Sequence, residues 1–154
     1  MIAIKPTKLK DFASLMQIEV LSEQKHAHLP FEQSYQQRSK YEVFLSLCVD
    51  QKAIGYLIID KAFSFSSTFA RRHELSLKYI VLDKAYQRKG LGRRVMQKLN
   101  IYANAISANS DSICVSIPAT DDASQQFFLA SGFVEERKLI YGKSGKERIL
   151  RHRL

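Results

Sequence analysis

The chain lacks any hydrophobic run long enough to cross a bilayer. No stretch approaches the ~20 consecutive apolar residues of a transmembrane helix. Its first residues, Met1-Ile2-Ala3-Ile4-Lys5-Pro6, are typical of a strand and not of a charged segment followed by the apolar core of a signal peptide. Internal repeats, low-complexity linkers and breaks in composition are also absent from the sequence. We therefore expect a cytoplasmic protein without membrane contact, folded as one domain over residues 1–154.

Cysteine is scarce. The two cysteines, Cys48 and Cys114, lie in apolar runs and form no metal-ligand spacing. Buried, reduced thiols are the simplest interpretation for a cytoplasmic protein. We therefore expect neither a disulfide nor a bound metal ion.

Acidic residues are few relative to basic ones, and the formal net charge is +9. Residues 137–154 contain seven basic residues and only one acidic residue, Glu147. Such a segment would suit nucleic acid or another acidic surface, but no nucleic-acid module is visible, and a solvated strand face is the interpretation we prefer. The shortage of carboxylates also disfavours a polycationic substrate such as a polyamine.

Hydrophobic periodicity predicts a mixed sheet flanked by helices. The expected strands are 1–5, 42–50, 53–60, 75–82, 113–118, 133–141 and 146–153. The expected helices are 8–24, 31–39, 93–105 and 121–131. Residues 61–73 fit either a strand extension or a loop. Because helices separate several of the strands, the predicted fold class is α/β (α+β), with about six or seven strands and about four helices.

The most informative stretch is Gln87-Arg88-Lys89-Gly90-Leu91-Gly92, which lies between the strand 75–82 and the helix 93–105. A strand that ends in a glycine-bearing turn and continues as a helix directs several backbone N–H groups towards one point. The helix start adds about half a positive charge there. Glycine leaves room for a ligand to approach the backbone, because no Cβ stands in the way. The stretch therefore predicts an anion site, suited to a pyrophosphate.

Two familiar phosphate-binding loops do not fit. The Walker loop requires Gly-x-x-x-x-Gly-Lys-Ser/Thr, which Gly90 does not complete, and the dinucleotide fingerprint requires a glycine where Val95 stands. The remaining pattern, Gln-x-x-Gly-x-Gly, resembles the coenzyme A loop of the GNAT acetyltransferase family, Arg/Gln-x-x-Gly-x-Gly/Ala. Further along, Phe127-Phe128-Leu129-Ala130-Ser131-Gly132-Phe133 is similar to that family's aromatic pair followed by Gly-Phe.

The resemblance implies a GNAT-like fold with a centrally splayed sheet. In that family the strand before the loop and the strand after the first long helix begin parallel and then separate, and acetyl-CoA lies in the opening as co-substrate. The implied cofactor-binding residues are Ile80, Val81 and Leu82 for the pantetheine arm, Gln87, Arg88, Lys89, Gly90, Leu91, Gly92 and Arg93 for the pyrophosphate, and Phe127 and Phe128 beside the pantetheine. Both phenylalanines fit equally well as core residues.

The implied reaction is acetyl transfer to a primary amine, which attacks the thioester directly in a ternary complex. The acceptor is left open among a small-molecule amine, a protein amine and an aminoacyl-RNA. Three positions depart from the family pattern: Phe128 stands at the usual acid tyrosine, Ser116 at a frequent acidic residue, and Asp121 at a common asparagine. We expect Asp121 to be a helix N-cap. These departures favour, as an alternative function, a CoA-binding sensor or partner module with weakened catalysis.

Candidate catalytic residues follow from position. Glu74 is the first choice for the base, because its even spacing from Leu82 predicts that both side chains share a face of the strand. An ion pair of Glu74 with Arg71 or Arg72 is at least as reasonable. Further candidates for proton transfer or substrate contact are His26, His28 and His73, with Tyr141 and Tyr79 as possible acids. Exposed strand edges would permit a homodimer without requiring one.

Overall fold

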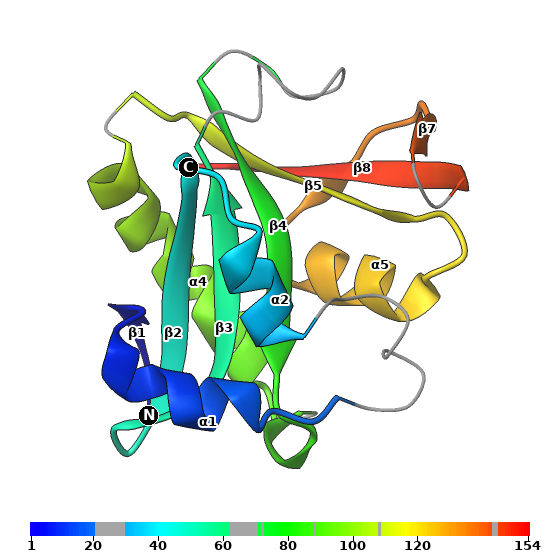
Figure 1. Cartoon of the computed structure of the whole chain (residues 1–154). Helices are drawn as coiled ribbons and strands as arrows, with labels where there is room; N and C mark the ends of the chain where they lie inside the picture. Colours follow the sequence, from blue (N-terminus) through cyan, green and yellow to red (C-terminus); the bar gives the residue numbers. More distant parts are fainter. Residues whose placement is uncertain (21–29, 62–70, 72, 88, 108, 143–144) are drawn as a thin grey trace.

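The computed structural model describes residues 1–20, 30–61, 71, 73–87, 89–107, 109–142 and 145–154. Its strands are β1 (Ile2–Pro6), β2 (Glu42–Val49), β3 (Lys52–Asp60), β4 (Glu74–Leu82), β5 (Ser112–Pro118), β6 (Val134–Glu135), β7 (Ile140–Gly142) and β8 (Gly145–Arg153). They form a single sheet of eight strands in the order β1-β2-β3-β4-β5-β8-β6, with β7 also paired to β8 (Figure 1). The predicted mixed sheet is confirmed. It has one strand more than expected because the segment 133–141 is divided into β6 and β7.

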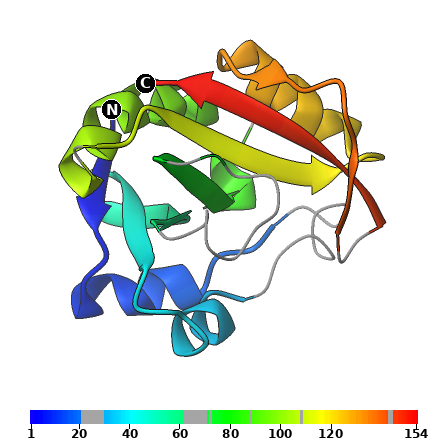
Figure 2. The same cartoon turned by 90° about the horizontal axis from the view of Figure 1, so that it is seen from above.

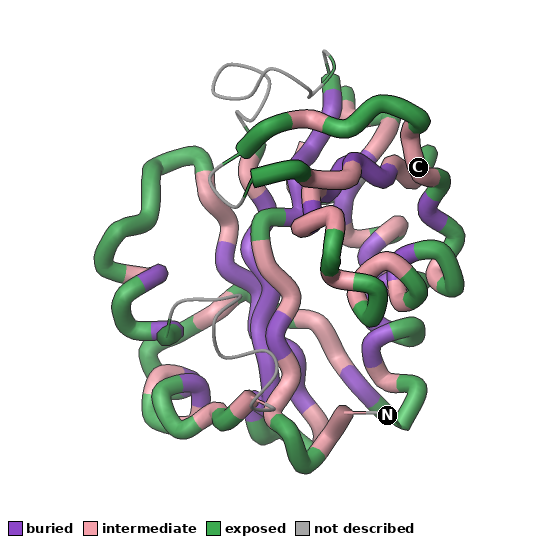
Figure 3. Tube along the Cα trace, turned by 90° about the vertical axis from the view of Figure 1, so that its right-hand side faces the viewer, coloured by how far each residue is buried: buried purple, intermediate pink, exposed green. Residues whose placement is uncertain are grey.

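Helices cover both faces of the sheet (Figures 1 and 2). The described α-helices are α1 (Phe12–Met16), α2 (Phe31–Gln36), α4 (Leu91–Ile106) and α5 (Asp122–Ala130), with 3-10 turns η1 (Leu9–Asp11) and η3 (Lys84–Tyr86). The side chains of α1 and α2 pack on one face in a core with Phe44, Tyr56 and Val81. Those of α4 and α5 pack on the other face with the remaining apolar strand residues. Figure 3 shows the result, with buried central strands and exposed outer helical turns.

The first helix is shorter than expected. The prediction of a helix over 8–24 is wrong, because α1 ends at Met16 and residues 17–20 are not helical; residues 21–24 of the expected helix lie outside the described residues. After α1 the chain is no longer helical, and it forms hydrogen bonds with the loop that follows β4. Glu19 donates its N–H to Asp83 Oδ1 over 2.9 Å, and Lys84 donates its N–H to the carbonyl of Glu19 over 2.7 Å. These long-range hydrogen bonds replace those that another helical turn would supply.

The sheet separates at its centre, between β4 and β5. These two strands form the sheet's parallel pair, and their pairing is limited to Glu74 with Ser112, Leu75 with Ile113 and Ser76 with Cys114. Beyond that point β5 continues to pair with β8 along its full length, Ser112–Pro118. The edge of residues 77–82 that faces β5 therefore has no strand partner within the described part of the chain. This is the splayed sheet that the sequence resemblance implied.

A β-bulge in β4 lies at the start of this separation. On the side of β3, Ile59 pairs with Leu77 and Ile58 pairs with Tyr79, so Lys78 is an extra residue. A bulge shifts the alternation of side chains by one position. As a result, Leu77 and Leu82 both contact the α4 core although their spacing is odd.

The bulge corrects one expectation about the site. Glu74 precedes Leu75, a residue of the α4 core, so it lies on the opposite face of the sheet from Leu82. The prediction that Glu74 and Leu82 share a face is therefore wrong. Even spacing places two side chains on the same face only in a strand without a bulge, and here Lys78 is an extra residue between Glu74 and Leu82.

Candidate active site

The turn between β4 and α4 is folded back onto the end of the strand. Asp83 accepts hydrogen bonds from the backbone N–H groups of Glu19 and Ala85. Gln87 donates from Nε2 to the carbonyl oxygen of Leu82 over 2.9 Å. These bonds connect the turn both to β4 and to the chain after α1. The start of α4 is thereby held in a defined place at the open end of the sheet.

Gly90 is the N-cap of α4 and has a left-handed φ of 75°, a conformation that favours glycine. A Cβ at this position would meet no atom within 4 Å, so the space beside it is open. The first N–H groups of a helix have no partner within the helix, and they face this end. Lys89, Arg93 and Arg94 are exposed around it, while Arg88 lies outside the described residues.

Gly92 serves a different purpose from Gly90. A Cβ at Gly92 would lie 2.5 Å from Cε1 of Phe127, which is too close for any real contact. The absence of a side chain therefore makes room for the Phe127 ring of α5. Leu91, between the two glycines, is half-buried against the α4 core. Packing of α5 onto the start of α4 thus depends on Gly92, and the open approach depends on Gly90.

The unpaired edge of β4 leads directly into this turn. Successive residues of a strand direct their N–H and C=O groups to opposite edges. The carbonyl oxygen of Val81 faces β3, since it would lie 2.3 Å from a Cβ placed on Gly55. Ile80 and Leu82 therefore direct their main-chain groups towards the gap, although the Leu82 carbonyl already accepts a bond from Gln87. Of the three residues expected to bind the pantetheine arm, Val81 is the one whose backbone groups face β3 and not the gap.

Glu74 lies at the closed end of the gap, in an ion pair. Its side chain has no exposed surface, and its oxygens accept hydrogen bonds from the Ser112 hydroxyl at 2.7 Å, the Arg71 N–H at 2.9 Å and Arg151 Nε at 3.0 Å. Arg151 also pairs with Glu136. The carboxylate joins β4, β5 and β8 where the sheet begins to separate. To act as a base, it would first have to leave these donors.

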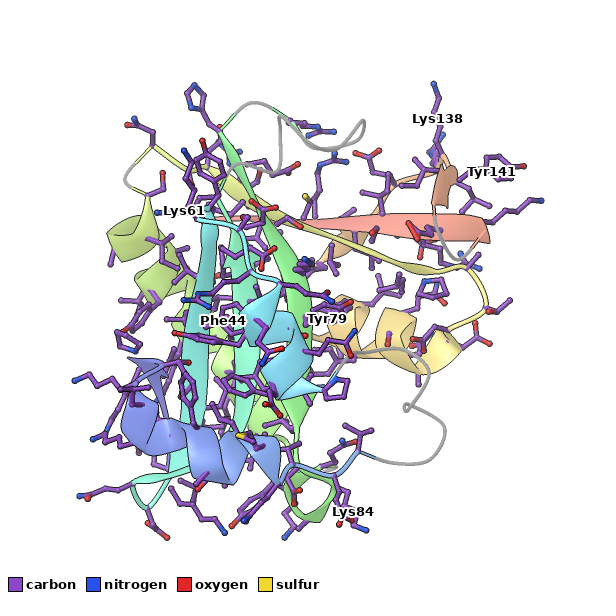
Figure 4. All side chains as sticks on the ribbon, in the orientation of Figure 1. Phe44, Lys61, Tyr79, Lys84, Lys138 and Tyr141 are labelled. Atoms are coloured by element: carbon purple, nitrogen blue, oxygen red, sulfur yellow. The ribbon has the colours of Figure 1, made fainter. Side chains whose placement is uncertain are left out.

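The two candidate tyrosines lie in different surroundings. Tyr141 belongs to β7, is 79% exposed, and points away from the sheet in Figure 4. Tyr79 lies on β4 beside the gap and packs against the aromatic core under α1 and α2. His73 is exposed at the start of β4 with φ of 62°. His26 and His28 lie outside the described residues.

A small pocket of about 80 Å³ opens beside the bulge of β4. It is lined by Ser34, Gln37, Glu42, Ile58, Lys78 and Tyr79. Within it, Lys78 Nζ and Glu42 Oε1 form a salt bridge of 2.8 Å. Sequence reasoning missed both of these residues. They are 36 positions apart, and only the pairing of β2, β3 and β4 brings them together.

Comparison with known proteins is consistent with this geometry. The sequence model described as the acetyltransferase (GNAT) family matches residues 11–133 of the 154 in the chain. The chain belongs to the GNAT acetyltransferase family. No curated protein matches the sequence.

Solved structures of GNAT proteins share the fold at low sequence identity. The GNAT domain of PAT from S. lividans has a TM-score of 0.74 at 15% identity, covering 98% of this chain and 89% of that one. The ribosomal-protein-S18-alanine N-acetyltransferase from Escherichia coli has a TM-score of 0.65 at 21% identity, covering 98% and 91%. AAC(6')-Ib in complex with acetyl-CoA has a TM-score of 0.76 at 13% identity, covering 99% and 93%. At these identities the likeness establishes the fold alone.

Two of the three departures from the GNAT pattern, Phe128 and Asp121, have structural explanations. Phe128, at the position of the usual tyrosine, is 4% exposed and packs in the core against Phe127 and Phe133. Asp121 is the N-cap of α5, as predicted, and accepts the N–H of Ser124 over 3.0 Å. Its carboxylate is thus engaged at the helix start.

The cysteines are free and buried, as expected. Burial raises the pKa of the Cys48 thiol above its ordinary value, and the pKa of Cys114 is raised further by burial and by the nearby Glu74 carboxylate. Both thiols are therefore protonated at neutral pH. In the described part of the chain, no three His, Cys, Asp or Glu side chains lie close enough to hold a metal ion, and no helix has the length and apolar character to span a membrane.

Proposed function

We propose that this GNAT protein transfers the acetyl group of acetyl-CoA to a primary amine. One observation supports this assignment above all others. The pairing of β4 with β5 ends after three residue pairs, and the edge left unpaired runs directly into the turn at Gly90 and the start of α4. An extended ligand with a diphosphate at one end matches that surface. The diphosphate needs N–H donors and positive charge, and the amide arm needs a strand edge.

The residues at the gap fit the two halves of such a ligand. Ile80 and Leu82 would pair with the amides of the pantetheine arm, and Val81 would contribute only indirectly, through its packing. The N-terminal N–H groups of α4, with Lys89 and Arg93, would hold the pyrophosphate beside the open space at Gly90. Gln87, Arg88, Leu91, Gly92, Phe127 and Phe128 complete the set expected from the sequence; of these, Gly92, Phe127 and Phe128 are engaged in packing.

The chemistry is a nucleophilic substitution at the thioester carbon. The amine lone pair forms the C–N bond, the C–S bond breaks, and the sulfur leaves with the electron pair and takes up a proton. The nitrogen releases its protons to solvent or to a base, because only the uncharged amine can attack. A thiol pKa of about 8.5 makes the thiolate a tolerable leaving group. An acid therefore accelerates the step without being indispensable.

Tyr79 is the hydroxyl that we assign to proton donation. It lies on β4 directly after the bulge and lines the pocket beside the gap. Tyr141 lies on an exposed hairpin, and Phe128 has no proton to give. Glu74 remains a predicted base, but its carboxylate is occupied by Ser112 and Arg151. A water molecule in the gap would accept the proton from the amine without any rearrangement of the protein.

The direct test combines calorimetry with an assay of thiol release. The purified chain should bind acetyl-CoA, and a panel of primary amines should include at least one that releases CoA. Gly90→Ala should weaken acetyl-CoA binding at least about tenfold, because it adds a side chain at the open approach and strains the left-handed N-cap. Gly145→Ala is the matched control, with φ of 87° and an equally open environment in the β7–β8 turn.

Phe128 favours one alternative to the transferase function, a CoA-binding sensor or partner module with weakened catalysis. Its buried ring stands where the family commonly has an acid. Tight binding of acetyl-CoA with no turnover of any amine would favour this alternative. No binding at all by a folded chain would rule out both functions.

A further inference from the structure

The pocket beside the β4 bulge adjoins the gap of the sheet. Lys78 and Tyr79 belong both to its lining and to the part of β4 that has no pairing with β5. Its other walls come from α2, through Ser34 and Gln37, from β2, through Glu42, and from β3, through Ile58. In Figure 4, Tyr79 lies beside β4 on the side where α2 covers the sheet. A group bound in this pocket would therefore contact the same segment of β4 that borders the gap, on the face that α2 covers.

The charges in the pocket are unevenly solvated. The Glu42 side chain is 8% exposed, whereas that of Lys78 is 47% exposed. A carboxylate with so little contact with water requires a cation or other donors nearby. Lys78 Nζ now supplies that cation at 2.8 Å, but its stem lies half in water and is flexible. The Glu42 carboxylate is therefore held in the wall of the pocket, whereas another cation could replace the Lys78 ammonium group.

A second acidic residue lies across the strand pair from Glu42. Glu42 and Asp60 are direct partners across the β2–β3 ladder. Side chains of directly opposed residues project on the same face of a sheet. Asp60 has interactions of its own, so the preference rests on Glu42: its buried negative charge favours an incoming positive charge and repels an incoming carboxylate.

We propose that Glu42 is the binding site for the acceptor amine in its ammonium form, and that Lys78 Nζ occupies the place of that group in the free protein. The bound nitrogen must then release a proton to solvent before it attacks the thioester. The inference rests on the proposed function, because it concerns the acceptor of the same reaction. A pocket of about 80 Å³ admits a slim end group. The substrate class is therefore a primary alkylamine whose carbon next to the nitrogen is unbranched and bears no carboxylate, as at the end of a lysine side chain or of a simple alkylamine.

Opposite effects of two substitutions test this assignment. Glu42→Gln should raise KM for an alkylamine such as n-butylamine at least about tenfold and leave KM for acetyl-CoA unchanged. Lys78→Met should lower KM for the same amine several-fold, because it removes the competing cation. Glu42→Asp, which keeps the charge, should retain part of the affinity. If the salt bridge served only stability, Glu42→Gln and Lys78→Met would shift KM in the same direction or not at all, and the assignment would be overturned.

A binding measurement separates this inference from the proposed function. Titration of n-butylamine at neutral pH, followed by NMR shifts of the folded protein, should give saturable binding to the parent, tighter binding to Lys78→Met and none to Glu42→Gln. That result without any acetyl transfer would support the cation site and refute the transferase. Turnover of alkylamines with equal amine affinity in the parent and in Glu42→Gln would support the transferase and overturn the cation site. Thermal unfolding of each variant verifies that the fold is intact.

Discussion

Removal of Arg151 should weaken the whole domain, because it would leave a buried carboxylate without its cation. The Arg151 side chain is 10% exposed, and that of Glu74 is fully buried. Loss of one partner of a buried ion pair typically costs about 3–5 kcal/mol. Glu74 would keep its bonds from Ser112 and from the Arg71 N–H. We therefore expect Arg151→Met to lower the free energy of unfolding by ~3 kcal/mol, near the lower limit of that range.

Urea unfolding followed by circular dichroism measures this loss. For a chain of 154 residues, ~3 kcal/mol corresponds to a decrease in Tm of about 6–12 °C. The double variant Glu74→Gln/Arg151→Met should be more stable than Arg151→Met alone, because it leaves no unpaired buried charge. Lys84→Met, which removes the exposed pair with Glu19, is the control and should have no measurable effect.

Two results would refute the reasoning. A change below about 1 kcal/mol in Arg151→Met would mean that the carboxylate is well solvated or otherwise neutralised, contrary to its burial. A Glu74→Gln variant with unchanged stability and no acetyl transfer would mean that Glu74 acts as the base and not as a connection between strands. Loss of stability with a proportionate loss of activity is the outcome we expect.

Three further predictions concern the turn, the acid and the thiols. Gly92→Ala should lower the free energy of unfolding by about 1–3 kcal/mol in urea, because the added Cβ overlaps an aromatic ring of α5; unchanged stability would contradict that packing. Tyr79→Phe should lower kcat in the thiol-release assay and Tyr141→Phe should not, since only the former lies beside the gap; the reverse order would shift the acid to the hairpin. Cys48 and Cys114 should react with a thiol reagent only after unfolding, because burial raises their pKa values; rapid labelling of the native protein would contradict this.

Much of the fold could be predicted because it depends on neighbouring residues. The glycines of Gln87–Gly92 and the flanking apolar runs predict a strand–turn–helix junction, and Gly90 indeed has a positive φ at the start of α4. Asp121 could be identified as an N-cap for the same reason, since its partner is the N–H three residues later. A turn or a cap needs a few consecutive residues only, so a single sequence suffices to recognise it.

The parts that failed depend on residues far apart in the chain. The helix expected over 8–24 ends early because Glu19 bonds Asp83, 64 positions away. Even spacing predicts the wrong face of β4 for Glu74, because no residue in the strand signals the bulge at Lys78, which arises in the register with β3. A bulge is a property of two paired strands, and periodicity within one strand cannot reveal it.

The amino-acid order alone therefore determined the family, the single mixed sheet and the place of the glycine turn before α4, because local conformation and hydrophobic spacing are recorded in consecutive residues. Only the tertiary structure decided that Glu74 joins Arg151, 77 positions away, and that Glu42 meets Lys78, 36 positions away. The physical reason is that an ion pair forms where strands bring two side chains within hydrogen-bond distance. That distance is set by strand order and register, which depend on the packing of the whole sheet.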